Sequence, residues 1–190
     1  MANEFYALMG RMRYITRWGL VRNTFSENIS EHSHQVAVLA HALALIRRDI
    51  LKMDGPDPDR CAVAALYHDA SEILTGDLPT PIKYHNPDIK DAYKQVERIA
   101  GERLLAMIPE ELRASYEHLV LDDEEVNPIV KAADKLSAHI KCLEEQKAGN
   151  TEFDSAAKQT WDAMKAMKQP ELDWFLDNCL GAFTLNLDQL

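Results

Sequence analysis

Residues 65–81 read ALYHDASEILTGDLPTP, a stretch that places a histidine and two carboxylates among alanine, leucine and isoleucine, and then a third acid, Asp77, in a turn that contains prolines. Its first half has the apolar spacing of a buried helix, which we expect to begin at Asp57-Pro58 and to end at Gly76. On such a helix His68 and Glu72, four residues apart, lie on one face. Ionisable groups are costly to bury without partners, so the pattern indicates a site rather than a plain core helix.

The rest of the chain also has helical periodicity, and no segment shows the two-residue alternation of a strand. A first helix is expected over Phe5–Ile15 and a second over about Ser30–Ile50, with its apolar stripe at Val36, Leu39, Ala40 and Leu43. Further helices are expected from Asn86 through Leu104, from Pro109, from Asn127 to about Gly149, from about Glu152 to Met167, and from Pro170 through Trp174. The expected fold class is all-α, a helical bundle, and its one long connection, 76–86, is a candidate active-site loop.

Composition limits the function classes. The 190 residues suit a single domain over 1–190, and the net charge of −10 disfavours nucleic-acid binding. A small anionic substrate would need a local positive centre, which a divalent cation provides. The N-terminal residues lack a signal-peptide core, and no apolar run reaches the ~18 residues of a membrane span. The dispersed, odd-numbered cysteines, Cys61, Cys142 and Cys179, are typical of buried thiols in a reducing cytosol.

Two polar residues elsewhere complete a candidate metal site. His32 stands at the start of the second helix, and Asp134 stands in the first turns of the helix that begins at Asn127, each beside an apolar stripe. Together with His68 and Asp69 they offer two nitrogen and two oxygen donors. Such a mixed set suits Co²⁺, Mn²⁺, Fe²⁺ or Zn²⁺ and leaves positions for water and substrate.

Each of these residues has a structural alternative. A histidine near a helix start is often solvated or hydrogen-bonded, and Asp134, flanked by Lys131 and Lys135, has the setting of a surface acid paired with lysine. The remaining histidines are weaker candidates for ligands. We expect His34 and His41 to share a packing or interface face, His139 to point away from Asp134, His118 to be a surface residue, and His85 to approach a ligand from the loop.

Four strings carry a family resemblance: RW at 17–18, ENISEHSHQVA at 27–37, ALYHDASEILTGDLPTPIKY at 65–84 and KAADKLSAHIKCLEE at 131–145. The order of His32, then His68-Asp69, then Asp134 resembles the HD-domain metal-dependent phosphohydrolases. The longer strings resemble the YfbR-type bacterial 5'-deoxynucleotidases. His34 departs from the family string, where an aliphatic residue is expected, and the stretch from 150 onward matches only loosely.

The resemblance implies a metal-dependent phosphomonoesterase that hydrolyses deoxyribonucleoside 5'-monophosphates to a deoxynucleoside and phosphate. It further implies a cytoplasmic homodimer with cobalt as the preferred ion in vitro. Arg17 would orient the phosphate, Trp18 would lie against the sugar and disfavour a 2'-hydroxyl, and Glu72 would be the catalytic acid or base. By the same resemblance the metal ligands would be His32, His68, Asp69 and Asp134. The residues that contact the substrate would be Arg17, Trp18, His32, Asp69, Asp77, Leu78, Pro79 and Thr80.

The chemistry of the residues agrees with this carry-over. A divalent ion lowers the pKa of a bound water, and Arg17 can hold phosphate oxygens in a planar fork. It stays open whether Glu72 bonds the attacking water or the leaving 5'-oxygen, and whether Asp77 is a second base or a partner of the 3'-hydroxyl. The structural alternatives are Arg17 as a helix C-terminal cap, Trp18 as core, Glu72 as an exposed acid and Asp77 as a turn residue.

Two other functions compete. An HD-domain phosphohydrolase acting on a nucleoside triphosphate, an alarmone or a cyclic dinucleotide usually needs a larger basic surface or more ligands, which this acidic sequence does not display. A non-catalytic sensing module, in which the ion only stabilises the helices, is disfavoured by Glu72 and the 76–84 loop beside the ligands. The sequence leaves the physiological metal, the base preference and the dimer interface open.

Overall fold

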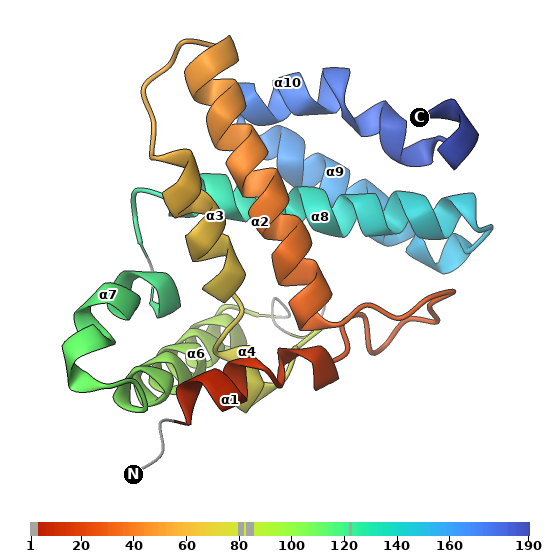
Figure 1. The fold of residues 1–190 in the computed structure, drawn as a ribbon. Helices are drawn as coiled ribbons and strands as arrows, with labels where there is room; N and C mark the ends of the chain where they lie inside the picture. The colour runs from red at the N-terminus through yellow and green to blue at the C-terminus, as the bar shows by residue number, and fades with distance from the viewer. Residues whose placement is uncertain (1–3, 80–81, 83–85, 122) are drawn as a thin grey trace.

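A computed structural model describes residues 4–79, 82, 86–121 and 123–190 (Figure 1). The helices are α1 (Phe5–Met9), α2 (Ile29–Leu45), α3 (Pro58–Tyr67), α4 (Glu72–Thr75), α6 (Pro87–Ala106), α7 (Glu110–Val120), α8 (Asn127–Lys147), α9 (Asp154–Met167) and α10 (Pro170–Asn178). A π-helical turn, Ile46–Ile50, extends α2, and short 3₁₀ turns lie at Met12–Tyr14, Thr151–Phe153, Leu180–Thr184 and Leu187–Gln189. Among the described residues, β pairing is limited to one antiparallel bridge between Thr16 and Asn28. The all-α prediction is confirmed.

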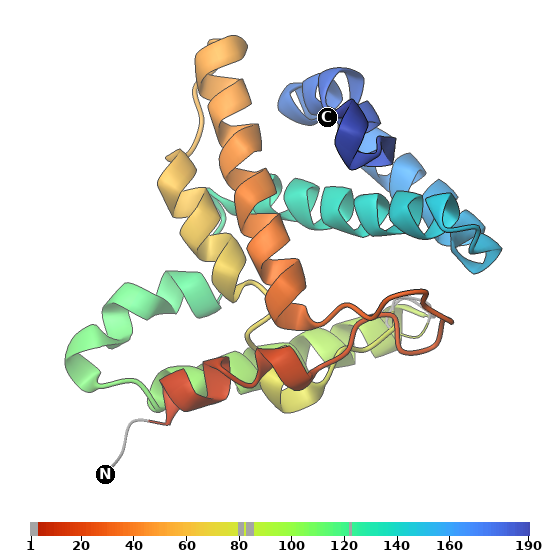
Figure 2. The same ribbon diagram turned by 45° about the vertical axis from the view of Figure 1, so that its right-hand side comes forward.

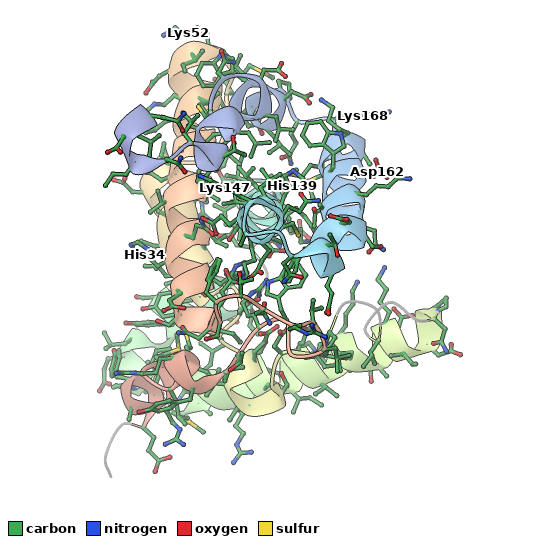
Figure 3. The ribbon with its side chains drawn as sticks, turned by 90° about the vertical axis from the view of Figure 1, so that its right-hand side faces the viewer. His34, Lys52, His139, Lys147, Asp162 and Lys168 are labelled. Carbon is green, nitrogen blue, oxygen red and sulfur yellow. The ribbon has the colours of Figure 1, made fainter. Side chains whose placement is uncertain are left out.

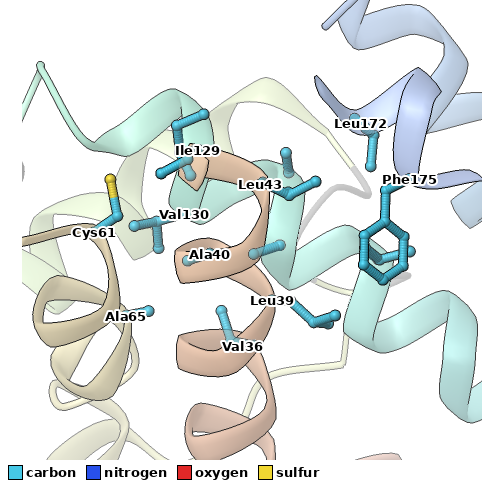
Figure 4. Close-up of a cluster of buried hydrophobic side chains, with 14 of the residues drawn as sticks. Val36, Leu39, Ala40, Leu43, Cys61, Ala65, Ile129, Val130, Leu172 and Phe175 are labelled. Atoms are coloured by element: carbon cyan, nitrogen blue, oxygen red, sulfur yellow. The ribbon is translucent and has the colours of Figure 1, made fainter. Parts of the chain in front are cut away.

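Helix α2 lies at the centre of the main core. Its predicted stripe is buried and faces α3 on one side and α8 on the other, while α10 closes the far end (Figure 4). The side chains that meet here are Val36, Leu39, Ala40 and Leu43 of α2, Cys61 and Ala65 of α3, Ile129 and Val130 of α8, and Leu172 and Phe175 of α10. Full burial of a Leu or Ile side chain stabilises the fold by about 1.5–3 kcal/mol, so this stripe fixes how α2 and α8 cross.

A second, smaller core lies at the other end of α2 and α3. There α1 runs alongside α6 in two views of the ribbon (Figures 1 and 2), and Phe5 packs against Leu104 and Leu105. Ala70, which is fully buried, belongs to the same cluster. The turn that carries His68 and Asp69 is therefore fixed between the two cores.

The prediction of one continuous helix from Asp57 to Gly76 is wrong, because the structure has a break within this segment. Helix α3 ends at Tyr67, and the short α4 begins only at Glu72. The His68 Nδ1 atom lies 2.7 Å from the carbonyl oxygen of Ala65, which a continuing helix would offer to the amide of residue 69. Tighter three-residue bonds follow, from Ala70 N to Tyr67 O and from Glu72 N to Asp69 O.

Helix starts were predicted better than helix ends. The Asn28 side chain caps α2 in a capping box with Glu31, and the Asp57 and Asn86 side chains cap α3 and α6. The expected first helix stops at Met9, and only a 3₁₀ turn covers part of its second half. None of the described helices combines the length and the apolar content needed to cross a membrane.

Candidate active site

Three segments bring the four predicted metal ligands together. His32 comes from the first turn of α2, His68 and Asp69 from the turn after α3, and Asp134 from α8. Ligand atoms of His32, His68 and Asp134 all lie within 4.8 Å of one another. The Asp69 Oδ2 atom borders this cluster, 3.7 Å from His32 Nε2 and 3.3 Å from His68 Nε2.

The hydrogen bonds behind the two imidazoles fix their tautomers. The Ser137 hydroxyl donates to Gln35 Oε1 at 2.6 Å, so it accepts from His32 Nδ1, which is 3.1 Å away. The His68 Nδ1 atom donates to the Ala65 carbonyl. Because both Nδ1 atoms carry the proton, both Nε2 atoms present a lone pair to the cluster, as metal-binding histidines do.

This arrangement fits a cation. His32 Nε2 and His68 Nε2 are buried and find no hydrogen-bond partner among the described residues. Instead, acceptor oxygens lie close to them: Asp134 Oδ1 is 3.2 Å from His32 Nε2, and Asp69 Oδ2 is 3.3 Å from His68 Nε2. Lone pairs that face carboxylates repel unless a positive charge lies between them. The donor set of imidazole nitrogens and carboxylate oxygens suits a divalent transition-metal ion.

The local charges favour the metal-binding protonation states. Burial and the nearby Arg17 both lower the pKa of His32, which keeps its imidazole neutral. Burial acts to raise the pKa of Asp134, but nearby positive charge, with the Lys135 ammonium group foremost, acts to lower it, and the pKa lies well below its ordinary value. The structural alternative for Asp134 is partly realised, since Lys135 Nζ lies 3.2 Å from Asp134 Oδ2 while Oδ1 faces His32.

Arg17 reaches the cluster from the loop before α2. Its Nη1 donates to Asp69 Oδ2 at 3.3 Å and its Nε donates to Glu27 Oε2 at 3.1 Å. Burial acts to lower the pKa of Arg17, but neighbouring carboxylates raise it overall, namely those of Asp69, Asp134, Glu27 and Asp77. Arg17 follows the Met12–Tyr14 turn and pairs its backbone N with Glu27 O, so it is not the cap of the first helix.

Trp18 combines a core contact with a place beside Arg17. Its ring packs against Phe153 at 5.1 Å between centroids, and its Nε1 donates to Glu27 Oε2 at 3.1 Å. The residue is partly exposed and has a backbone φ of 59°. Part of the indole therefore packs as the structural alternative expects, whereas the rest stays accessible near Arg17.

A buried ion pair fixes the far end of this loop. Lys141 and Glu145 of α8 are 2% and 0% exposed and form an ion pair of 2.5 Å. Lys141 Nζ also donates to Phe25 O, and Glu145 accepts from the backbone N and the hydroxyl of Thr24. The loop that carries Arg17 and Trp18 is thus tied to the same helix that supplies Asp134.

Glu72, the expected catalytic acid or base, is buried, and the segment 76–79 that follows it is half-buried. Glu72 is 7% exposed, so the alternative of an exposed helix acid is wrong. Gly76 has a φ of 74° that favours glycine, and its carbonyl accepts from Tyr93 of α6 at 3.2 Å. Asp77, Leu78 and Pro79 are half-buried, whereas Thr80 lies outside the described residues.

A cavity of about 680 Å³ adjoins the cluster at His68 and Asp134. It is bounded by α3, α6, α7 and α8, and basic side chains line it: Lys90, Lys94, Arg98, His118 and Lys131. Sequence reasoning missed this basic lining, although Lys90, Lys94 and Arg98 recur every four residues and so share a face of α6. It also missed Glu27 and Ser137, which are buried polar residues within the quoted strings.

The other histidines lie away from the cluster or at its rim. His34 is exposed on the outer side of α2, and His139 lies between α8 and α9, where its Nδ1 is 2.9 Å from Thr160 Oγ1 (Figure 3). His41 pairs with Asp59 at 3.3 Å. His118, expected at the surface, is exposed but also lines the cavity. His85 lies outside the described residues.

Comparison with known proteins agrees with this geometry. Residues 4–183 match the family model described as 5'-deoxynucleotidase YfbR-like. A 5'-deoxynucleotidase of Vibrio atlanticus (strain LGP32) is 47% identical, with 99% of this chain and 98% of the relative covered. A 5'-deoxynucleotidase of Erwinia tasmaniensis is 46% identical, with 99% and 96% covered.

Solved structures share the fold at low sequence identity. An HD-domain phosphohydrolase from Listeria innocua superposes with a TM-score of 0.83 at 20% identity, over 97% of this chain and 90% of the other. A cyanophage S-2L HD phosphohydrolase, bound to dA and one catalytic Zn²⁺ ion, gives a TM-score of 0.66 at 23% identity, with 92% and 95% covered. On the family match and the full-length relatives, the chain belongs to the YfbR-like 5'-deoxynucleotidase family.

Proposed function

We propose that this protein is a metal-dependent 5'-deoxynucleotidase that hydrolyses deoxyribonucleoside 5'-monophosphates to a deoxynucleoside and phosphate. The observation that carries the proposal is the cluster of buried Nε2 lone pairs and carboxylates, beside a guanidinium, in a chain whose full-length relatives are 5'-deoxynucleotidases. The cavity of about 680 Å³ is within the size range of small-molecule sites, and it meets the cluster at His68 and Asp134. Arg17, Trp18 and residues 77–79 are not among its described lining residues, so these contacts are proposed on the other side of the cluster.

In this proposal His32, His68, Asp69 and Asp134 hold the ion. When bound, the ion supplies a Lewis acid for a phosphate oxygen and a water of lowered pKa. We assign Co²⁺ as the preferred ion in vitro, with Mn²⁺, Zn²⁺ and Fe²⁺ as alternatives. The donor chemistry supports the class of ion and leaves the choice within it to measurement.

The remaining residues bind, orient and transfer protons. Arg17 offers its remaining N–H donors to phosphate oxygens, since Asp69 and Glu27 occupy Nη1 and Nε. Glu72, which is buried, takes a proton from the attacking water or gives one to the leaving 5'-oxygen. Trp18 lies against the sugar and disfavours a 2'-hydroxyl.

The pocket floor is assigned to the segment after Gly76. Asp77, whose negative charge raises the pKa of Arg17, accepts a hydrogen bond from the 3'-hydroxyl or serves as a second base. Leu78, Pro79 and Thr80 line the substrate pocket. His32 and Asp69 contact the substrate as well as the ion. A cytoplasmic homodimer completes the proposal, and its support is the family alone.

A substrate panel on purified protein of known metal content tests the function. Phosphate release from dAMP, dGMP and TMP with Co²⁺ or Mn²⁺, and much slower release from AMP, is the expected result. Equal rates on dAMP and AMP would refute sugar selection. Absence of release from every monophosphate, at full metal occupancy, would refute the enzyme assignment.

A second candidate function is favoured by the basic lining of the cavity. Lys94, Arg98 and Lys131 line the cavity that adjoins the cluster, together with the carboxylates of Glu97 and Asp123, and they are cations that could contact the outer phosphates of a nucleoside triphosphate. Product analysis separates the two functions. If the protein acts on nucleoside triphosphates, dATP should yield deoxyadenosine or dAMP faster than dAMP is hydrolysed. The Lys94→Gln variant should slow dATP turnover in that case and leave dAMP turnover nearly unchanged.

A further inference from the structure

Glu27 lies behind both side chains that are proposed to face the nucleotide. Its Oε2 accepts from Arg17 Nε and from Trp18 Nε1, each at 3.1 Å. The residue is 9% exposed, and its backbone oxygen accepts from Arg17 N at 2.9 Å. The bridge between Thr16 and Asn28 holds the two segments side by side, so the carboxylate faces Arg17 and Trp18 at a fixed register.

We propose that Glu27 is a positioning residue that sets phosphate orientation and sugar selection together, by holding Arg17 and Trp18 on one carboxylate oxygen. The inference rests on the proposed function, since it takes the phosphate role of Arg17 and the sugar role of Trp18 from there. It assigns a function to a residue that lies within a quoted string but belongs neither to the predicted ligands nor to the predicted substrate contacts.

The geometry of Arg17 explains why a second carboxylate is needed. An arginine side chain has many rotamers, and the bond of Arg17 to Asp69 alone leaves rotation about that contact. Bonds at both Nε and Nη1 fix the plane of the guanidinium. A fixed plane aims the other donors at one place, which is what bidentate recognition of a phosphate requires.

Trp18 needs the same partner for a different reason. Its φ of 59° is uncommon for a bulky residue, and such a strained conformation persists only when the surrounding contacts hold it. The contact with Phe153 holds one part of the ring, and the bond from Nε1 to Glu27 fixes its rotation about that contact. Loss of the bond would therefore change where the indole lies relative to the sugar.

The test compares Glu27→Ala and Glu27→Gln with the wild type on dAMP and AMP, with metal content measured for each protein. Glu27→Ala should raise the KM for dAMP about tenfold or more and lower the ratio of kcat/KM for dAMP over AMP. Glu27→Gln keeps a carbonyl oxygen that can accept from both donors, so it should recover most of the ratio. Glu31→Ala, another acid of the α2 start that bonds the Asn28 backbone, is the matched control and should leave the ratio unchanged.

A merely structural role predicts a different pattern. Equal loss on dAMP and AMP, with an unchanged KM and an unchanged ratio, would overturn the proposal, and so would wild-type kinetics in Glu27→Ala. If Glu27→Ala does not fold, the Glu27→Asp variant, which keeps the charge on a shorter side chain, should show the lowered ratio instead. A wild-type ratio in a folded Glu27→Asp protein would also count against the proposal.

Fluorescence provides a readout independent of turnover. With Trp161 and Trp174 replaced by Phe, Trp18 is the sole tryptophan, and Glu27→Ala should move its emission to longer wavelength while Glu27→Gln stays near the wild type. Unchanged emission would overturn the positioning of Trp18 even if the enzyme is active. Shifted emission in a protein that hydrolyses no nucleotide would mean that the proposed function has failed and the contact has not.

Discussion

Ser137 Oγ lies 3.1 Å from His32 Nδ1 while its own proton goes to Gln35, so α8 fixes the tautomer of an imidazole on α2. Such partners behind a metal ligand orient the ring and raise its basicity. The relationship links the crossing of the two central helices to the chemistry of the site.

Replacing Ser137 by alanine should therefore weaken metal binding by about 10–100-fold, because His32 loses the acceptor that directs its Nε2 lone pair to the cluster. Competition with a fluorescent chelator measures the affinity. The control is Ser33→Ala, which removes a buried hydroxyl one residue from His32 that has no partner among the described residues. Equal affinities in the two variants would contradict the role of Ser137.

Glu72→Gln should lower the kcat for dAMP by about 10²–10⁴-fold, because the amide cannot transfer a proton, while the nucleotide Kd changes little. Phosphate release and calorimetric binding measure the two quantities. Asp77→Asn, made in parallel, decides which acid is the base. A larger fall in kcat for Asp77→Asn than for Glu72→Gln would move that role to Asp77.

The parts of the fold that follow from periodicity were predictable. The α2 stripe, the capped helix starts and the all-α class depend on residues close in sequence, and each was confirmed. The break at His68 was not predictable from spacing, because it depends on one side chain taking a backbone carbonyl from the helix. The single domain over 1–190 stays a prediction.

The candidate site likewise contains residues that could be predicted from the sequence and residues that could not. The structure groups His32, His68 and Asp134, with Asp69 at the border of the cluster, and these residues could be predicted as a set from their donor chemistry and from a family resemblance that joins residues far apart in the chain. Glu27 and Ser137 were missed because a lone glutamate before a helix, or a lone serine within one, has no signal of burial in the sequence. Their roles appear only when the loop before α2 and the face of α8 are placed beside the ligands.

Removing the metal should separate a catalytic ion from a structural one. The main core is built from apolar side chains of α2, α3, α8 and α10, so chelation should abolish phosphate release and leave helical circular dichroism almost unchanged. The midpoint temperature of thermal unfolding should fall only by the amount that corresponds to the lost free energy of metal binding. Loss of helical signal on chelation, reversed by Co²⁺ or Mn²⁺, would instead favour a metal-stabilised module.

The buried pair of Lys141 and Glu145 predicts an acid-sensitive stability. Burial acts to raise the pKa of Glu145, but the bonds from Lys141, Thr24 and Asn150 lower it from 4.5 to about 2. Because the folded pKa lies below the unfolded one, the stabilisation is complete above about pH 4.5 and is lost as the pH falls towards about 2.

The pKa difference corresponds to a stabilisation on the order of 3 kcal/mol. Urea unfolding at pH 7, 5, 4 and 3 should show that the difference in free energy of unfolding between the wild type and Glu145→Gln is constant between the first two and shrinks below them, because the buried neutral His32 and His139 titrate alike in both proteins. In Glu145→Gln the protein should be less stable at pH 7 and the fall below pH 5 smaller, since Lys141 keeps its charge without a counter-ion and the titrating group is gone. Identical pH profiles for the two proteins would show that Glu145 is not the group that titrates, and the acid sensitivity would then belong to other carboxylates.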